Sequence, residues 1–309
     1  MRFLITGGTG FIGSYVAREL VGRGDEIVAY DLYPRMDLIR DIADKVKVVR
    51  GDTSDFVELS DAVKANHIDK IIHMAFLLIS DSRENPPRAL RVNCVGSNNV
   101  LEAARRFDLK RVVVASSTAV YAGGSLYGKQ AVNEDSLIKP NTLYGAFKVL
   151  NEFITDHYYE QYGIETINLR PTVVYGYGRQ RGGFTFANDI IQYPASGKPA
   201  EIPYGNMDID WNYVKDCAKA FVLASDTKMP KHRAFNIGGE CRSFRDAAAI
   251  VKKYILNAQI TLGDKSLDWV SRYDITRARE ELGYKPSYTL EEGVKDFIQV
   301  IMREEMQRA

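Results

Sequence analysis

The sequence predicts an α/β protein in which a doubly wound parallel sheet is followed by a smaller C-terminal lobe. Short β-branched runs alternate with helical patterns over the first two thirds, and a glycine-rich turn follows the first run. After residue 172 this rhythm gives way to loops that contain glycine and proline. Near-continuous apolar strands separated by helices are typical of a parallel sheet covered on both faces, with right-handed crossovers.

The larger domain is expected to span residues 1–172. Its helices are indicated by apolar residues that recur every three or four positions, as in the segment that ends at Gly22 and Gly24. The expected strands are 2–6, 26–31, 46–52, 70–75, 111–117 and 165–171, and the expected helices are 12–23, 55–66, 86–106 and 143–162.

Residues 173–309 are expected to form the smaller lobe, which interleaves with the larger domain. A last strand at about 233–239, RAFNIGG, is expected to return to the first sheet. Helices are expected near 215–225, 243–256 and 290–307.

The charge balance argues against several classes of partner. The 309 residues hold 41 Lys and Arg against 40 Asp and Glu, so no electrostatic footprint for nucleic acid or an anionic membrane is visible. No apolar stretch is long enough to span a bilayer, and the first apolar run is too short for a signal peptide. We therefore expect a cytoplasmic protein that acts on a small molecule, without nucleic acid or membrane partners.

The cysteines and histidines suggest neither a disulfide framework nor a metal site. The three cysteines are far apart and form no C-x-x-C pair, and the four histidines have no ligand-like spacing. No metal is expected, and the cysteine usage fits a reducing compartment.

The stretch TGGTGFIG at residues 6–13 contains two overlapping glycine patterns. Gly7, Gly10 and Gly13 form G-x-x-G-x-x-G, whereas Gly8 with the last two forms the G-x-G-x-x-G dinucleotide fingerprint. Such a turn between a strand and a helix lets the backbone approach a pyrophosphate, and the helix N-terminus attracts the anion. The order of strand, turn and helix therefore predicts a Rossmann-type dinucleotide site.

Asp31 ends the next strand and is expected to accept hydrogen bonds from the adenosine ribose. Its charge repels the extra phosphate of NADP, so NAD is the expected cofactor, although Arg35 lies nearby in the sequence. His73 is interpreted as a satisfied core residue rather than a catalyst. The further expected cofactor contacts are Phe11, Ile12, Asp52, Thr53, Met74, Ala75, Ser116, Pro171 and Val174.

The segment YGAFK places Tyr144 and Lys148 on one face of an expected helix, because they are four residues apart. An ammonium beside a phenol favours the phenolate, which would draw the tyrosine pKa down from its reference near 10. Tyr144 would then serve as a general acid/base. The fifth strand ends in hydroxyl side chains, where Ser117 is placed to hydrogen-bond the substrate oxygen.

Together these motifs resemble the extended short-chain dehydrogenase/reductases, the NAD-dependent epimerase/dehydratase family. The resemblance covers nearly the whole chain and extends to VNCVG, LRPTVVYG, DWNYVKDCAKA, FNIGG and DITRAREELGYKP. It implies that Ser117, Tyr144 and Lys148 carry catalysis, that these last two also contact NAD, and that Asn93 supports the lysine through a water. Tyr144 would remove the proton of a secondary alcohol while hydride moves to NAD, with Lys148 on the nicotinamide ribose.

Residues at the family's substrate positions give information about the substrate. Thr118 and Ala119 stand where dehydratases carry acidic residues, which argues against dehydration. Nucleotide-sugar epimerases usually have an asparagine and an arginine toward the diphosphate, where this chain has Val173 and Ile209. Neither replacement can donate a hydrogen bond. Arg179 and Arg181 lie in a nearby loop. They would either bind the diphosphate in place of the missing asparagine and arginine, or form an ordinary solvated basic loop.

A second resemblance, to short-chain L-threonine 3-dehydrogenases, rests on FLLISDSRENPPRALRVN and RGGFTFANDIIQYPASGK. By this resemblance Ser80, Thr118 and Thr185 line the substrate pocket, together with Ser117 and Arg181. We therefore favour an NAD-dependent oxidoreductase or epimerase acting on a sugar-like polyhydroxylated small molecule. The alternatives are a nucleotide-sugar (UDP-hexose) 4-epimerase, an L-threonine 3-dehydrogenase-like enzyme and, least favoured, a non-catalytic NAD-binding regulator.

The helices expected at 86–106 and 143–162 are apolar on more than one face. One face must cover the sheet, so the surplus predicts a homodimer paired through these helices, as the resemblance also implies.

Overall fold

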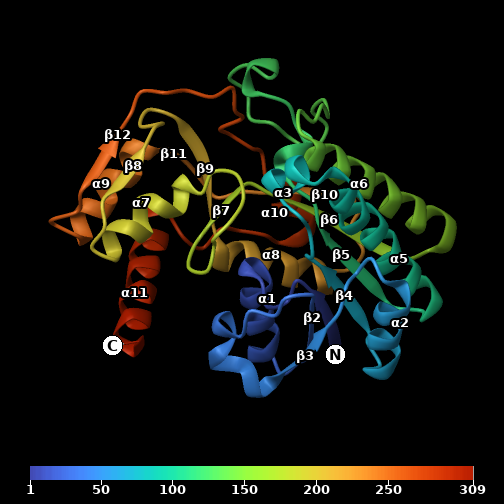
Figure 1. Ribbon diagram of the computed structural model, residues 1–309. Helices are drawn as coiled ribbons and strands as arrows, with labels where there is room; N and C mark the ends of the chain where they lie inside the picture. Colours follow the sequence, from blue (N-terminus) through green and yellow to red (C-terminus); the bar gives the residue numbers. More distant parts are fainter. Residues whose placement is uncertain (309) are drawn as a thin grey trace.

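A computed structural model describes residues 1–308 and shows a seven-stranded, wholly parallel sheet with helices on both faces (Figure 1). The strand order is β10-β6-β5-β4-β1-β2-β3. The chain reverses direction across the sheet between β1 and β4, and ligands of open α/β sheets bind outside the carboxyl ends of the strands at such a point. The strands are β1 (Arg2–Thr6), β2 (Glu26–Asp31), β3 (Val46–Arg50), β4 (Lys70–His73), β5 (Arg111–Ala115), β6 (Glu165–Pro171) and β10 (Ala234–Ile237).

Alternate residues of the central strands enter two separate cores. In β1, Phe3 and Ile5 pack with α1 (Phe11–Gly22) and α8 (Val214–Asp226), whereas Leu4 packs with the helices on the opposite face. Since successive strand side chains point to opposite faces, this apolar run accounts for a sheet buried on both sides. The helices opposite α1 are α2 (Phe56–Ala65), α5 (Gly96–Arg106) and α6 (Leu143–Tyr162).

The helix expected at 86–106 is divided into three segments. It comprises α4 (Pro86–Leu90), a π-helical turn η3 (Arg91–Val95) and α5, and a short helix α3 (Ile79–Glu84) precedes it. Asn85 separates α3 from α4, and its side chain accepts a hydrogen bond from the Arg88 N–H. The 3₁₀ turns are η1 (Met36–Leu38), η2 (Arg40–Lys45), η4 (Thr118–Val120) and η5 (Gly124–Leu126).

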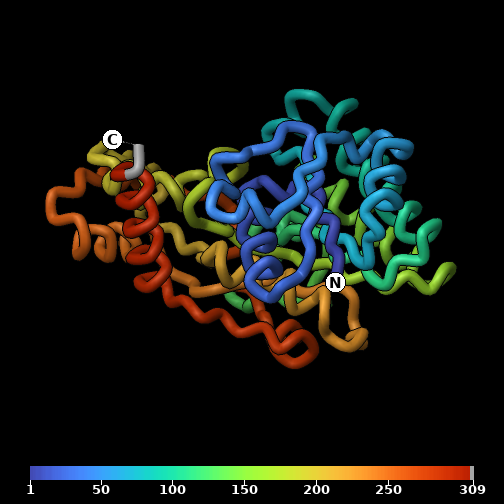
Figure 2. The backbone as a smooth tube through the Cα atoms, turned by 90° about the horizontal axis from the view of Figure 1, so that it is seen from below, coloured from blue at the N-terminus to red at the C-terminus, as the bar shows by residue number. Residues whose placement is uncertain are grey.

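The smaller lobe lies to one side of the main sheet, as seen in Figure 2. Its aromatic core includes Tyr175, Trp211 and Phe244, whose rings meet edge to face. The strand expected near 233–239 is β10, which pairs with β6 and so lies in the main sheet. The other elements are β7 (Val173–Tyr175), β8 (Ala200–Ile202), β9 (Asp208–Tyr213), β11 (Glu240–Ser243), β12 (Ile260–Leu262), α7 (Phe186–Ala195), α9 (Phe244–Tyr254), α10 (Thr276–Leu282) and α11 (Leu290–Arg308).

Within the described residues, no helix has the length and apolar character needed to cross a membrane.

Candidate active site

A cavity of about 740 Å³ opens at the carboxyl edge of the main sheet. Its walls come from the β1–α1 turn, the ends of β2, β4 and β5, the first turns of α6, and the loop between β7 and α7. This is the edge at which the strand order reverses, so the cavity lies where the fold class predicts a ligand.

The glycine turn is packed too tightly for side chains. Gly7 has a φ of +72°, and a Cβ there would lie 3.0 Å from the Met74 carbonyl carbon. A Cβ on Gly13 would lie 2.1 Å from the Gly7 oxygen. Gly7, Gly10 and Gly13 line the cavity, whereas Gly8 packs against Ala29 of β2. The G-x-x-G-x-x-G pattern therefore faces the cavity, and the backbone cradle at the N-terminus of α1 fits a pyrophosphate.

Asp31 lines the cavity at the end of β2. Its Oδ2 accepts hydrogen bonds of 2.7 Å from both the backbone N–H and the hydroxyl of Thr9. Burial raises the pKa of Asp31, and the two bonds from Thr9 act against that rise. Thr9 engages only Oδ2, so the carboxylate keeps accepting capacity for a ribose hydroxyl.

Arg35 also lines the cavity, close to Asp31. Its guanidinium pairs with Asp37 at 2.6 Å and donates to the Gly178 carbonyl at 3.3 Å. Its charge is therefore already paired within its own loop, and the preference for NAD over NADP stays a prediction that rests on Asp31.

Two other expected cofactor residues lie outside the cavity lining. The Oδ1 of Asp52 accepts two bonds of 2.8 Å from Ser54, and the carbonyl of Thr53 accepts one of 3.0 Å from the Asn99 amide. Both residues organise the turn before α2, and their role toward a cofactor stays a prediction. The remaining expected contacts in the lining are Phe11, Ile12, Met74, Ala75, Ser116, Pro171 and Val174.

His73 is fully buried and occupied by structural contacts. Its ring nitrogens lie 2.7 Å from the Thr6 hydroxyl and 3.0 Å from the Ser97 hydroxyl. Burial, together with the charge of Lys148, lowers the pKa of His73 to about 3. A neutral imidazole with both nitrogens partnered agrees with the interpretation of His73 as a core residue.

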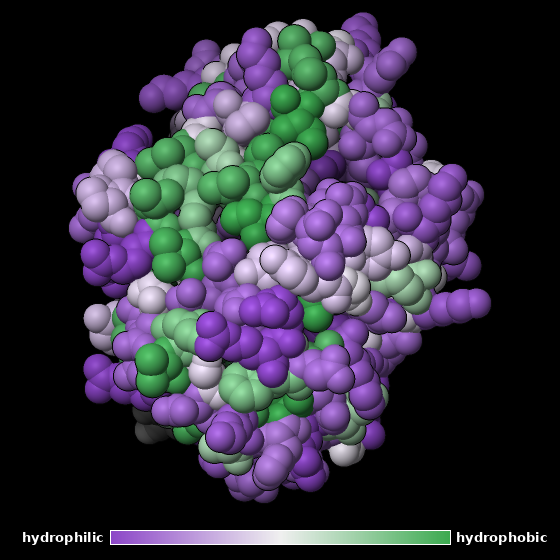
Figure 3. Space-filling model, turned by 90° about the vertical axis from the view of Figure 1, so that its right-hand side faces the viewer, coloured by the Kyte–Doolittle hydropathy of each residue, from purple (hydrophilic) through white to green (hydrophobic). Residues whose placement is uncertain are grey.

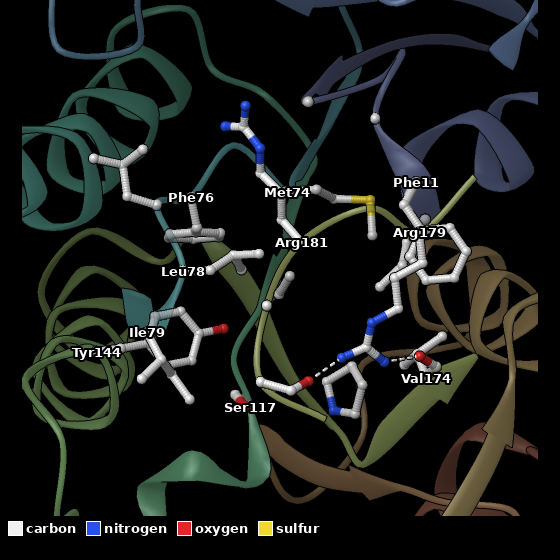
Figure 4. A pocket seen from close by; sticks show the side chains of 18 of the residues that line it. Phe11, Met74, Phe76, Leu78, Ile79, Ser117, Tyr144, Val174, Arg179 and Arg181 are labelled. Carbon is white, nitrogen blue, oxygen red and sulfur yellow. Dashed lines mark hydrogen bonds between the residues drawn. The ribbon is translucent and has the colours of Figure 1, made fainter. Parts of the chain in front are cut away.

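Tyr144 and Ser117 are brought together at the cavity floor, as Figure 4 shows. Tyr144 lies in the first turn of α6, whose start is capped by the Thr142 hydroxyl accepting from the Gly145 N–H at 3.1 Å. Burial raises the pKa of Tyr144 to about 12, while its hydrogen bond with Ser117 and the charge of Arg179 act to lower it.

Lys148 does not tune Tyr144 in the way that the sequence predicts, and that expectation is corrected here. The ammonium donates to the Ala115 carbonyl and lies 2.8 Å from the centroid of the Phe76 ring, but 5.3 Å from that of Tyr144. Burial lowers the pKa of Lys148 well below its usual value, with Glu152 opposing. The pKa of Tyr144 is therefore raised rather than lowered, because its own burial outweighs the hydrogen bond with Ser117 and the charge of Arg179.

Asn93 lies in the π-helical turn and is completely buried. Its side chain bonds both backbone groups of Leu77. The Oδ1 accepts from the Leu77 N–H at 2.8 Å, and the Nδ2 donates to the Leu77 carbonyl at 2.9 Å. Asn93 thus fixes the chain after β4, and it is not among the residues that line the cavity. Its expected support of Lys148 stays a prediction.

The expected substrate residues divide into two groups. Thr118 and Arg181 line the cavity together with Ser117, and the Thr118 hydroxyl donates to the Pro171 carbonyl at 3.2 Å. Ser80, in α3, and Thr185, before α7, lie outside the lining. Val173 lines the cavity, whereas Ile209 is buried in the core.

Several lining residues were absent from the sequence-based site, among them Phe76, Phe184, Trp269 and Arg179. Phe76 directly follows the HMA motif, so the motif could have indicated that Phe76 lines the cavity. The rings of Phe184 and Trp269 are tilted by 51° to each other with centroids 4.2 Å apart, but Trp269 lies in a segment without periodicity that gives no local signal. Arg179 was recognised as part of its loop but not as a cavity residue.

Comparison with known proteins gives consistent matches. The model of the NAD dependent epimerase/dehydratase family matches residues 3–238. A putative UDP-glucose 4-epimerase of Methanocaldococcus jannaschii is 31% identical over 94% of this chain and 95% of its own length.

Solved structures match along the whole fold. L-threonine dehydrogenase from Clostridium difficile is 26% identical with a TM-score of 0.87, covering 98% of both chains. MoeE5 in complex with UDP-glucuronic acid and NAD is 27% identical with a TM-score of 0.85, covering 99% of this chain and all of its own.

Proposed function

The chain belongs to the NAD-dependent epimerase/dehydratase family, and on that premise we propose that it oxidises a secondary alcohol of a sugar-like, polyhydroxylated small molecule. It is an NAD-dependent enzyme of the extended short-chain dehydrogenase type. The observation that carries the proposal is the convergence of Tyr144 and Ser117 on the cavity floor, with Lys148 one turn further along α6.

Each cavity residue has a separate role in the proposed oxidation. Bound NAD supplies the hydride acceptor. Tyr144 takes the hydroxyl proton of the substrate as the carbonyl forms, and Ser117 donates a hydrogen bond to the same oxygen. Gly7, Gly10 and Gly13 would hold the pyrophosphate, and Asp31 the adenosine ribose.

Lys148 also lines the cavity, and it supports the reaction from the second turn of α6. Its buried ammonium is positioned by the Ala115 carbonyl and the Phe76 ring. We propose that Lys148 uses this fixed position to hold the nicotinamide ribose of bound NAD, as the family resemblance implies.

A nucleotide-sugar 4-epimerase is the second candidate. It is favoured by the similarity to the putative UDP-glucose 4-epimerase of M. jannaschii and to MoeE5, whose structure contains UDP-glucuronic acid. It is opposed by Val173 and Ile209, which offer a diphosphate no hydrogen bond. The likeness to L-threonine dehydrogenase supports the third candidate, a dehydrogenase of a small free substrate. The retention of both Tyr144 and Lys148 argues against a non-catalytic regulator.

One assay separates these candidates. The purified protein is incubated with NAD and, in turn, UDP-glucose, UDP-glucuronate, D-glucuronate and L-threonine. A dehydrogenase releases NADH, which absorbs at 340 nm, whereas an epimerase produces an epimer that chromatography resolves and releases no NADH. If none of these compounds, nor a wider set of sugars and sugar acids, yields NADH or an epimer, the proposed function is wrong.

We also propose that the protein is a homodimer. Figure 3 shows apolar side chains gathered on the side of the molecule where α5 and α6 lie. Phe153 is 75% exposed on α6, and an aromatic ring left in water at that extent costs free energy that a partner helix would recover. Its exposed apolar neighbours in this region are Leu90, Val95, Leu143 and Leu150.

A further inference from the structure

Arg179 carries a positive charge into the substrate end of the cavity. It lies in the loop between β7 and α7, and its guanidinium and the Tyr144 hydroxyl approach the space above Ser117 from opposite sides (Figure 4). The guanidinium donates to two backbone carbonyls, Val174 and Gly183. These bonds hold the two ends of the loop together but do not neutralise the charge.

The guanidinium has no carboxylate partner within 4.0 Å in residues 1–308. Asp189 is the acid whose charge acts on it, and it does so from beyond ion-pair distance. Burial lowers the pKa of Arg179 to about 10, against the opposing charges of Asp189 and Tyr144. Arg179 is partly buried, and a partly desolvated cation without a counter-ion is costly, whereas carbonyl contacts alone could be made by a neutral donor.

The rest of the substrate end adds positive charge. Arg88 and Arg181 also line the cavity. The acidic residues of the lining are Asp31, which lies at the adenosine end and is held by Thr9, and Asp81. The Asp81 carboxylate accepts from the Leu78 backbone N–H at 3.1 Å, so it caps its own helix.

We propose that Arg179 binds a carboxylate of the substrate, placed next to the alcohol whose proton Tyr144 removes. The substrate is then a hydroxy acid in which the reacting carbinol lies close to the carboxylate. This inference rests on the proposed role of Tyr144, since that residue fixes where the reacting oxygen lies. A guanidinium retains donors beyond the two already used, enough for a carboxylate to bind in a bidentate manner.

Three sources of such a carboxylate are distinguished by matched pairs of probes. The pairs are D-glucuronate and D-glucose for a free sugar acid, UDP-glucuronate and UDP-glucose for a nucleotide-linked one, and L-threonine and L-threoninol for an amino acid. Binding is measured by calorimetry on the NADH-loaded protein, which cannot oxidise the probes. We expect the acid of one pair to bind about 10- to 100-fold more tightly than its neutral partner.

The variants separate recognition from folding. Arg179→Met is expected to remove the preference for the acid while leaving affinity for NADH unchanged, and Arg179→Lys to restore part of it. Arg303→Met, which removes an exposed arginine on α11, is the matched control and should bind all probes as the wild type does. Equal binding of acid and neutral probes in all three pairs, no binding of any acid, or a preference that survives in Arg179→Met would overturn the inference.

The proposed function fails separately from this inference. Acid binding that depends on Arg179, in a protein that forms neither NADH nor an epimer, would retain the carboxylate site and reject the oxidation chemistry. Turnover of neutral alcohols that is unaffected in Arg179→Met would retain the chemistry and reject the site.

Discussion

The Lys148 ammonium lies against the face of the Phe76 ring, 2.8 Å from its centroid, in a site from which solvent is excluded. Phe76 extends from the chain just after β4, whereas Lys148 comes from α6, so the contact joins the segment after β4 to the helix that carries Tyr144. A cation over an aromatic face is stabilised by the ring quadrupole, but this recovers only part of the cost of burying the charge.

Removing that buried charge is expected to stabilise the fold while abolishing activity. Because burial lowers the pKa of Lys148, the unfolded chain binds a proton that the native state holds less tightly. Stability therefore rises with pH between the lowered native pKa and the unfolded value of about 10.4. Lys148→Met should raise the free energy of unfolding at pH 7 by about 1–3 kcal/mol and flatten that pH dependence.

Urea denaturation of the two proteins at several pH values checks this prediction. Lys198→Met, which replaces an exposed lysine, is the control and should change stability little. A Lys148→Met protein that is less stable than the wild type at pH 7 would show that the buried ammonium is a net stabilising group.

The ion pair of Glu152 and Arg170 is expected to be essential for the geometry of the fifth and sixth strands. Glu152 lies one turn beyond Lys148, pairs with Arg170 at 2.6 Å and also accepts from Ser116 in the cavity lining. Glu152→Ala leaves a buried guanidinium unpaired and should cost about 3–5 kcal/mol. In a double-mutant cycle, Glu152→Leu with Arg170→Met should recover much of that loss, and strict additivity would contradict the assignment.

Cofactor selection is expected to follow Asp31. Asp31→Ser removes the charge that repels a 2′-phosphate, so it should weaken NAD binding and bring the affinity for NADP within about tenfold of it. Adding Asp37→Ala frees Arg35 from its ion pair and should favour NADP further. Fluorescence titration with NADH and NADPH measures both. An unchanged preference in the double variant would remove Asp31 from the cofactor site.

The apolar surface of α6 predicts a dimer that a single charge disrupts. Phe153→Glu should give a folded monomer in light scattering at micromolar concentration, because a desolvated carboxylate opposes the interface. Leu256 is 88% exposed and lies after α9, so Leu256→Glu is the matched control and should leave the dimer intact. A wild-type protein that is monomeric under these conditions would contradict the dimer itself.

The elements defined by local sequence patterns could be predicted from the sequence. The β1–α1 turn, the helix that carries Tyr144 and the strand ends follow from local patterns, and α6 spans the expected residues 143–162. The sequence did not show the π-helical turn at Asn93, nor that the Asn93 side chain would bond the distant Leu77. Nor did it reveal that Phe76 would hold Lys148, or that Trp269 would reach the cavity, since both contacts join segments far apart in the chain.

The pKa of Tyr144 shows why spacing alone was insufficient. A separation of four residues places Tyr144 and Lys148 on one helix face, but it does not say where the ammonium points or how dry the phenol is. In the structure burial outweighs the charges and raises the pKa of Tyr144 to about 12. Local pattern predicts which groups meet, whereas their protonation depends on solvent exclusion by the whole fold.

The central claim, that Tyr144 is the acid/base for oxidation of a secondary alcohol, is tested most directly by Tyr144→Phe. Pre-steady-state NADH formation is followed at 340 nm with NAD and the substrate identified among the four compounds above and the wider set of sugars and sugar acids. We expect the rate constant to fall by about 10²–10⁴-fold while NAD affinity is unchanged. Formation of NADH at a near-normal rate by the Tyr144→Phe protein would contradict the account.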